Sequence, residues 1–193
     1  MNCVKSTVEI EDIIKKSRFI GMLFPCQSEN EALQLINQQH QQHPNASHIV
    51  YAYRIKSTTK IITRFNDAGE PSGTAGKPIF IHLEGKDLIN LICIVARYYG
   101  GIKLGAGGLT RAYGNMAKKA ITASSISEFI EYTEFKIELE YNQMQKFEYH
   151  LAKLKGIILD QEFSENINLV VKIPEQNQNI LKNIFPTSIV SKV

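Results

Sequence analysis

The residues best suited to chemistry in this chain lie in one basic, glycine-rich stretch. No acidic side chain occurs between Asp87 and Glu128. Five cations fall inside that window: Arg97, Lys103, Arg111, Lys118 and Lys119. Five glycines lie in the segment RYYGGIKLGAGG: Gly100, Gly101, Gly105, Gly107 and Gly108. A glycine-rich loop that leads into a helix can aim several backbone N–H groups at one point, where the helix adds its positive end. The stretch therefore predicts an anion-binding site.

The side chains around this loop suggest which anion it binds. Arg97 and Arg111 could flank one phosphate, because a guanidinium matches two phosphate oxygens. Lys103 would add a mobile cation from the loop. Tyr98 and Tyr99 could stack on a base, as aromatic side chains do in single-stranded nucleic-acid sites. Alternatively, the glycines only allow a tight strand-to-helix connection and the tyrosines belong to the core.

A second motif, NDAGEPSGTAGKP, carries the acidic residues Asp67 and Glu70 among small residues. These two carboxylates could bind a cation or act as an acid/base pair, although a metal usually needs more ligands than two. In the structural interpretation, which we favour, Asp67 caps the turn and Glu70 forms an ion pair with Arg97 or Lys77. No metal site is predicted.

Few other residues offer reactive chemistry. His48, on a predicted strand, could be a ligand or a base, but a lone strand histidine is more often held by a structural hydrogen bond. Cys93 lies in an apolar run that would raise its pKa and silence the thiol. The sequence has no nucleophile elbow, Walker-type phosphate loop, zinc signature or serine-histidine-acid spacing, so its motifs do not indicate an enzyme or a cofactor.

The elements that position the loop can be predicted from periodicity. Two strands should meet near Lys15 and Lys16, and Ser28 with Glu31 has the spacing of a capping box for a helix to about His40. Further elements follow in order: strands at 47–55 and 60–66, a short helix in 77–85, a strand buried on both faces within 88–99, and a helix at about 108–125.

A second domain is expected after the glycine-rich part. Residues 134–141 alternate as a strand, Asn142 could cap a helix that Gly156 ends, and strands at 157–163 and 167–173 precede a last short helix. This β-α-β-β-α order is most of a ferredoxin-like sandwich. The predicted fold class is α+β, with domains at 1–127 and 128–193.

Composition agrees with a globular, cytoplasmic protein of two domains. The chain has 193 residues, of which 44% are hydrophobic and 21% charged, and its net charge is +3. No apolar run could cross a membrane, and the amino-terminal residues lack the pattern of a secretory signal. The three cysteines are expected to be free thiols. Residues 1–125 carry 15 basic and 9 acidic side chains, and residues 126–193 carry 7 and 10, so the two parts should attract different partners.

Four segments together resemble the YigZ/IMPACT family: KKSRFI, SHIVYAYRI, NDAGEPSGTAGKPI and IVARYYGGIKLGAGGLTRAYG. The resemblance implies a first domain like domain 2 of ribosomal protein S5, followed by a domain like the carboxyl-terminal part of elongation factor G. It also implies a role in translation regulation. The chain departs from the family at Ala68, where many relatives have a second aspartate, and at Ile49 and Val50 beside the histidine. These departures weaken a metal site in the acidic loop and a reactive cysteine–histidine site at His48.

The leading hypothesis is therefore a translation-associated regulator that binds RNA or the ribosome. Phosphate contacts would come from Arg97, Lys103, Arg111 and Lys118, and stacking from Tyr98 or Tyr99. One alternative is an enzyme that binds a nucleotide or phosphorylated metabolite at the same loop and uses Asp67 or Glu70. Another is a protein-interaction module of the IMPACT type, with a protein partner.

Overall fold

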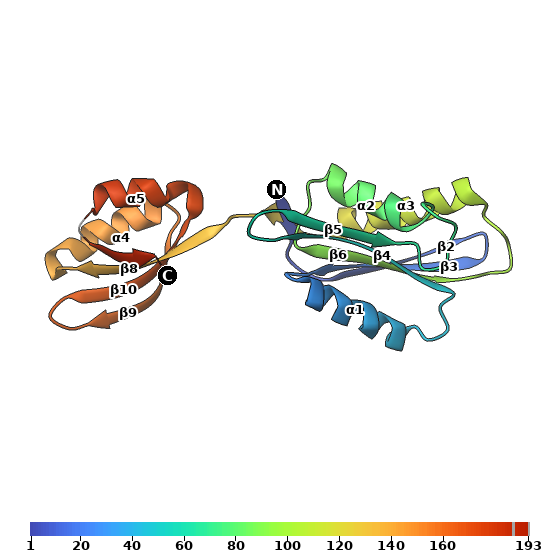
Figure 1. Ribbon diagram of the computed structural model, residues 1–193, viewed down its shortest axis with the longest axis horizontal. Helices are drawn as coiled ribbons and strands as arrows, with labels where there is room; N and C mark the ends of the chain where they lie inside the picture. The colour runs from blue at the N-terminus through green and yellow to red at the C-terminus, as the bar shows by residue number, and fades with distance from the viewer. Residues whose placement is uncertain (187, 193) are drawn as a thin grey trace. The chain divides into compact units, whose positions relative to one another are not determined.

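A computed structural model describes residues 1–186 and 188–192 of the chain. The chain forms two compact units, one of residues 1–129 and one that starts at Ile130. The sequence placed this boundary two residues earlier. Both units combine helices with sheets, which confirms the α+β class (Figure 1).

The first unit is built on a five-stranded sheet in the order β2-β3-β6-β4-β5, antiparallel throughout. The strands are β2 (Val8–Ile14), β3 (Ser17–Pro25), β4 (His48–Lys56), β5 (Ile61–Asn66) and β6 (Leu91–Tyr98). β6 is the central strand, and all of its residues except the last are buried. That position explains its continuous apolar run, because both faces of a central strand need apolar side chains when both are covered.

Helices cover both faces of this sheet. α1 (Glu29–Gln42) packs on one face, and α2 (Gly76–Gly85) and α3 (Ala106–Ala123) pack on the other (Figure 1). Ser28 caps α1 as predicted, since its Oγ accepts a hydrogen bond from the Glu31 N–H at 3.2 Å. Ala32 and Ile36 form the buried stripe of the helix, and Leu33 is 52% exposed.

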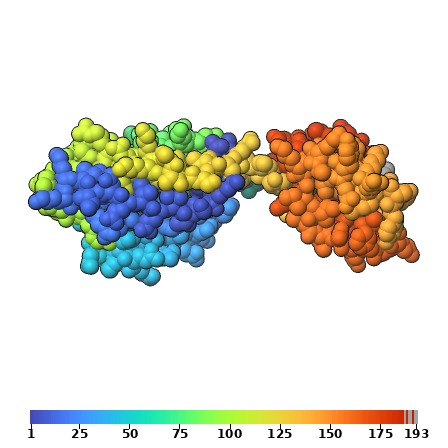
Figure 2. Space-filling model, turned by 180° about the vertical axis from the view of Figure 1, so that it is seen from behind, coloured from blue at the N-terminus to red at the C-terminus, as the bar shows by residue number. Residues whose placement is uncertain are grey.

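Two short strands join the ends of the first unit. β1 (Asn2–Val4) pairs antiparallel with β7 (Ile126–Glu128), which follows α3. In Figure 2 the blue residues of the β2–β3 hairpin lie beside the yellow-green residues of α3, where Lys119 pairs with Asp12. The sequence predicted neither short strand, because a three-residue strand has almost no periodic pattern.

The second unit is a complete ferredoxin-like sandwich. It contains β8 (Tyr132–Leu139), α4 (Met144–Lys153), β9 (Ile157–Phe163), β10 (Ile167–Pro174), α5 (Gln178–Ile184) and β11 (Ile189–Lys192), with strand order β11-β8-β10-β9. The last strand was not predicted. The expected cap at Asn142 is wrong: Glu140 forms the capping box with Gln143 on a 3₁₀ turn that precedes α4. Among the described residues, no helix is long and apolar enough to cross a membrane.

Candidate functional site

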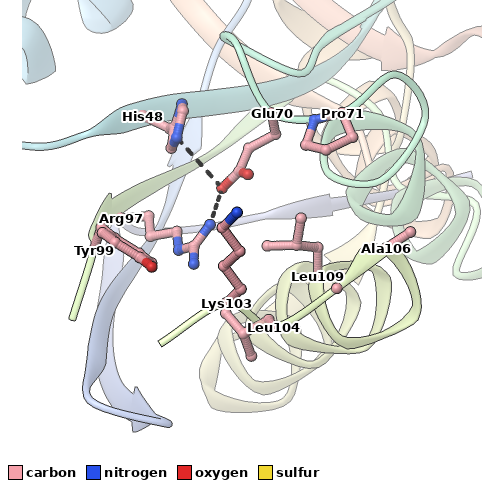
Figure 3. A pocket seen from close by; sticks show the side chains of 10 residues that line it. His48, Glu70, Pro71, Arg97, Tyr99, Lys103, Leu104, Ala106 and Leu109 are labelled. Atoms are coloured by element: carbon pink, nitrogen blue, oxygen red, sulfur yellow. Dashed lines mark hydrogen bonds and ion pairs between the residues drawn. The ribbon is translucent and has the colours of Figure 1, made fainter. Parts of the chain in front are cut away.

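A pocket of about 400 Å³ opens where β4 and β6 meet the loop that leads into α3 (Figure 3). Polar and charged side chains line one part of it, and apolar side chains the rest. The lining residues are His48, Glu70, Pro71, Arg97, Tyr99, Lys103, Leu104, Gly105, Ala106 and Leu109. The glycine-rich segment and the acidic loop therefore contribute to one site, although they are separate in the sequence.

A buried ion pair forms one wall of the pocket. Arg97 Nη1 lies 2.5 Å from Glu70 Oε1, and both side chains are about 95% buried, with 5% and 4% exposed. The Tyr113 hydroxyl donates to the same oxygen at 2.7 Å, and burial together with this carboxylate raises the pKa of Tyr113. Arg97 Nη2 donates to Ser17 Oγ at 3.3 Å. The predicted ion pair between Glu70 and Arg97 is confirmed, and it balances the charge of Arg97.

His48 also lines the pocket, directly opposite Arg97 in the pairing of β4 with β6. Its Nδ1 lies 2.9 Å from the Ala68 carbonyl oxygen. Because a carbonyl only accepts, Nδ1 carries a proton and donates it. The other nitrogen, Nε2, lies 3.9 Å from Glu70 Oε1. The histidine has the structural hydrogen bond expected of it and, in addition, presents its second nitrogen to the pocket.

Asp67 has a structural task outside the pocket. Its Oδ1 accepts the N–H groups of Ala75 and Gly76 at 3.0 and 2.8 Å, and its Oδ2 accepts that of Gly73 at 2.8 Å. These donors lie at and before the start of α2, so the predicted capping role is confirmed. Among the described residues, no group of three or more histidines, cysteines and acids could hold a metal ion.

The glycine-rich loop brings the start of α3 to the pocket. Gly105 has φ +72°, in the left-handed region that glycine adopts readily, and α3 begins directly after it at Ala106. The N–H groups in the first turn of an α-helix have no partner within the helix, and in α3 no side chain caps them. Gly105 and Ala106 line the pocket, whereas Gly107 and Gly108, which belong to the first turn of α3, do not.

Gly100 serves packing. A side chain there would place its Cβ 2.0 Å from the backbone of Lys16 in the β2–β3 turn. Gly101 has φ +84° and is not a lining residue. The structural interpretation of the glycines therefore holds for these two positions, while Gly105 borders the pocket.

The predicted cations fall into two places. Lys103 reaches the pocket from the loop, near the Glu70–Arg97 pair in Figure 3. Arg111 and Lys118 are exposed on the outer face of α3 and do not line it. Arg97 and Arg111 consequently do not flank a common point in the pocket. Lys118 borders a separate hollow of about 470 Å³ with Asn115 and Thr122.

The two tyrosines point to opposite faces of the sheet, because side chains alternate along a strand. Tyr99 lines the pocket, is 48% exposed, and has the Arg97 guanidinium 5.5 Å from its ring centroid. Tyr98 packs toward α1 instead, with its hydroxyl 2.9 Å from His43 Nδ1. Tyr99 is therefore the only one of the two that could stack on a ligand in this pocket.

The cysteines are all free thiols, as expected. Burial raises the pKa of Cys93 to about 12 and that of Cys26 to about 11. Both thiols are therefore protonated and unreactive near neutral pH.

Comparison with known proteins shows which family this chain resembles. Residues 15–121 match the Impact N-terminal domain, and residues 137–183 match a domain of unknown function, DUF1949. An IMPACT family member of Haemophilus influenzae is 40% identical over 173 residues, which cover 89% of this chain and 84% of the relative. The chain belongs to the IMPACT family. A second relative, YvyE of Bacillus subtilis, is 36% identical over 91% of this chain and 81% of its own length.

One solved structure matches nearly the whole chain in fold. The crystal structure of a hypothetical protein aligns with 97% of this chain and 94% of its own chain, with 30% sequence identity and a TM-score of 0.69. The two-domain translational regulator Yih1 covers 60% of this chain and 45% of its own, with 25% identity and a TM-score of 0.39, which is too low to carry an inference.

All lining residues of the pocket fall inside the IMPACT amino-terminal domain. Sequence reasoning missed the place of His48 and the support that Tyr113 gives to Glu70. The only available signal for His48 was its position at the start of a strand that pairs with β6. That pairing register could not be read without the structure.

Proposed function

We propose that the protein is a translation-associated regulator that binds RNA through this pocket and the basic outer face of α3. One observation carries the proposal: Lys103 and the uncapped start of α3 share a pocket with the half-exposed ring of Tyr99. A cation and free backbone N–H groups suit a phosphate, and an open aromatic ring suits a base. The link to translation is what the resemblance to the family implies.

Each group has a defined task in this proposal. Lys103 and the first turn of α3 hold a phosphate, and Tyr99 supports the adjacent base. Arg97 contacts no phosphate, because Glu70 already balances its charge, and its guanidinium backs the Tyr99 ring. Arg111 and Lys118, exposed and seven residues apart on one face of α3, attract further phosphates of the strand.

Binding of a labelled single-stranded RNA, followed by fluorescence anisotropy at several salt concentrations, tests the proposal. Affinity should fall steeply between about 50 and 200 mM salt, and each lost phosphate contact should reduce the slope of log K against log salt by about 0.7. Lys103→Ala and the double change Arg111→Ala with Lys118→Ala should each weaken binding. Lys60→Ala is the matched control, because this exposed lysine follows β4 at the end of the strand away from His48.

An affinity that does not depend on salt would contradict the proposal, and so would an affinity that Lys60→Ala lowers as much as Lys103→Ala does. Co-sedimentation with ribosomes at moderate salt is a second measurement. It should be lost in the Lys103→Ala variant if the pocket holds ribosomal RNA.

A second candidate is an enzyme that binds a nucleotide or a phosphorylated metabolite in the same pocket. The observation in its favour is His48, whose Nδ1 is held by the Ala68 carbonyl so that Nε2 is positioned beside Glu70, an arrangement suited to accepting a proton. A thermal-shift screen against nucleotides and sugar phosphates tests it, since a tight ligand raises the melting temperature by mass action. Asp67, which this hypothesis included, is committed to capping α2 and has no part in it.

A further inference from the structure

We propose that the pocket selects ribose over deoxyribose, with Glu70 or His48 accepting the single hydrogen bond that the 2′-hydroxyl of a bound nucleotide can donate. The inference rests on the proposed function in that the ligand is a nucleotide, either free or within a strand. It assigns a specificity role to two residues that otherwise only maintain the pocket wall.

Glu70 offers one acceptor. Its Oε1 is occupied by Arg97 and Tyr113. Its Oε2 has no hydrogen-bond partner among residues 1–186 and 188–192, although only 4% of the side chain is exposed and the residue lines the pocket. A carboxylate in an ion pair can only accept hydrogen bonds, and a polar atom in a largely buried side chain favours a ligand that donates one.

His48 offers the second acceptor. Its Nδ1–H is donated to Ala68, so the Nδ1–H tautomer keeps a lone pair on Nε2 that can accept a hydrogen bond. The distance of 3.9 Å between Nε2 and Glu70 Oε1 is too long for a hydrogen bond. Figure 3 shows the ring of His48 and the carboxylate of Glu70 directed toward each other at one side of the pocket.

The remaining lining groups place the sugar between these acceptors and the rest of the ligand. With the base on Tyr99 and the phosphate at Lys103 and the start of α3, the sugar is the part of a nucleotide left to contact Glu70 and His48. A 2′-hydroxyl donates its one hydrogen to one of these acceptors, whereas a deoxyribose has no hydroxyl there to donate. Sites built to bind a hydroxyl reject analogues that lack it, because polar groups of the protein are then left unpaired.

The first test varies the ligand and leaves the protein unchanged. Four labelled single strands of one base sequence carry hydroxyl, hydrogen, fluorine or methoxy groups at the 2′ position. We expect the RNA strand to bind at least about tenfold more tightly than the other three, the factor typical of a hydrogen bond to a charged group. The 2′-fluoro strand is decisive, because fluorine cannot donate. Equal binding of the 2′-fluoro or DNA strand and the RNA strand would overturn the inference.

The second test varies the protein. The ratio of RNA to DNA affinity should move toward one in whichever of His48→Ala and Glu70→Gln changes the acceptor, while Lys103→Ala should weaken the binding of both strands by the same factor. Circular dichroism of each variant identifies any loss of folding, and the ligand series above remains valid where a variant does not fold. An unchanged ratio in folded His48→Ala and Glu70→Gln would overturn the assignment of these residues.

Titration calorimetry with each ribonucleoside 5′-monophosphate and its 2′-deoxy counterpart separates this inference from the proposed function. Preference for the ribose form without any strand binding supports the inference and contradicts RNA binding. Binding of the strands without a preference for ribose supports RNA binding and contradicts the inference. Binding of neither nucleotides nor strands overturns both.

Discussion

Glu70 and Arg97 are 27 positions apart in sequence, yet they form a buried pair at the pocket wall. Breaking such a buried pair is strongly destabilising, because removal of one partner leaves the other charge buried and unpaired. The exposed pair of Arg18 with Glu11 has no such consequence. The positive character of the pocket therefore depends on Lys103 and the start of α3, and a variant of Arg97 would report on folding before it reported on ligand binding.

Gly100 and Gly107 give a matched pair of substitutions. Gly100→Ala should destabilise the protein by about 2 kcal/mol or more, because its Cβ would overlap the Lys16 backbone, which cannot rotate away. Gly107→Ala should be neutral or stabilise by up to about 1 kcal/mol, since no atom lies within 4 Å and alanine favours the helix. Urea unfolding measures both, and equal effects would contradict the assigned packing role.

At the level of single residues, the sequence predicted interactions that are local or that follow from charge. The cap at Ser28 and the turn contacts of Asp67 depend on neighbours a few positions away, and the pairing of Glu70 with Arg97 joins an acid and a cation in two unusual motifs. The location of His48 and the separation of Tyr98 from Tyr99 depend on strand register and facing, which a single sequence does not reveal.

At the level of elements, long periodic segments were predicted well and short ones were missed. β6 was recognised because a central strand must be apolar on both faces. α3 starts at Ala106 rather than Gly108, because the left-handed Gly105 is the residue that turns the chain into the helix. β1, β7 and β11 have three or four residues each, and they are fixed by partners far away in sequence.

The packing of α2 against α3 should make stability sensitive to acid. His82 on α2 lies close to Gly114 of α3, and burial, followed by the charge of Lys118, lowers its pKa from the ordinary value of 6.5. The folded state therefore binds a proton less readily than the unfolded state. Above pH 6.5 His82 is neutral in both states and does not reduce the free energy of unfolding. As the pH falls below 6.5 toward the pKa of the folded state, the unfolded state takes up the proton first, and the free energy of unfolding decreases.

Thermal unfolding of wild type and His82→Gln from about pH 7.5 to about pH 5 measures this effect. The melting temperature of wild type should fall more than that of His82→Gln. His40→Gln, which changes an exposed histidine in the last turn of α1, should follow wild type. Parallel curves for wild type and His82→Gln would refute the prediction.

At the level of the whole molecule, the two units have separate cores and different charge. The buried cluster around Phe135 and Leu169 contains only residues of the second unit, and the clusters of the first unit contain none of them. The basic side chains discussed above lie in the first unit. The sequence predicted this division from the change in pattern and charge after residue 125.

We expect residues 1–129 expressed alone to fold and to bind RNA within about twofold of the full chain, because every lining residue of the pocket lies in this unit. Circular dichroism and anisotropy measure the two properties. Residues 130–193 should fold without binding. A folded first unit with no affinity would show that the second unit takes part in recognition.

The pairing of β1 with β7 affects how the protein is made. Residues 2–4 leave the ribosome before the rest of the first unit, but their partners 126–128 are synthesised only after the strands and helices between them. The backbone N–H and C=O groups of β1 must therefore stay solvated until more than 120 further residues have been added. Closure of this small sheet is accordingly among the last events in the biogenesis of the first unit.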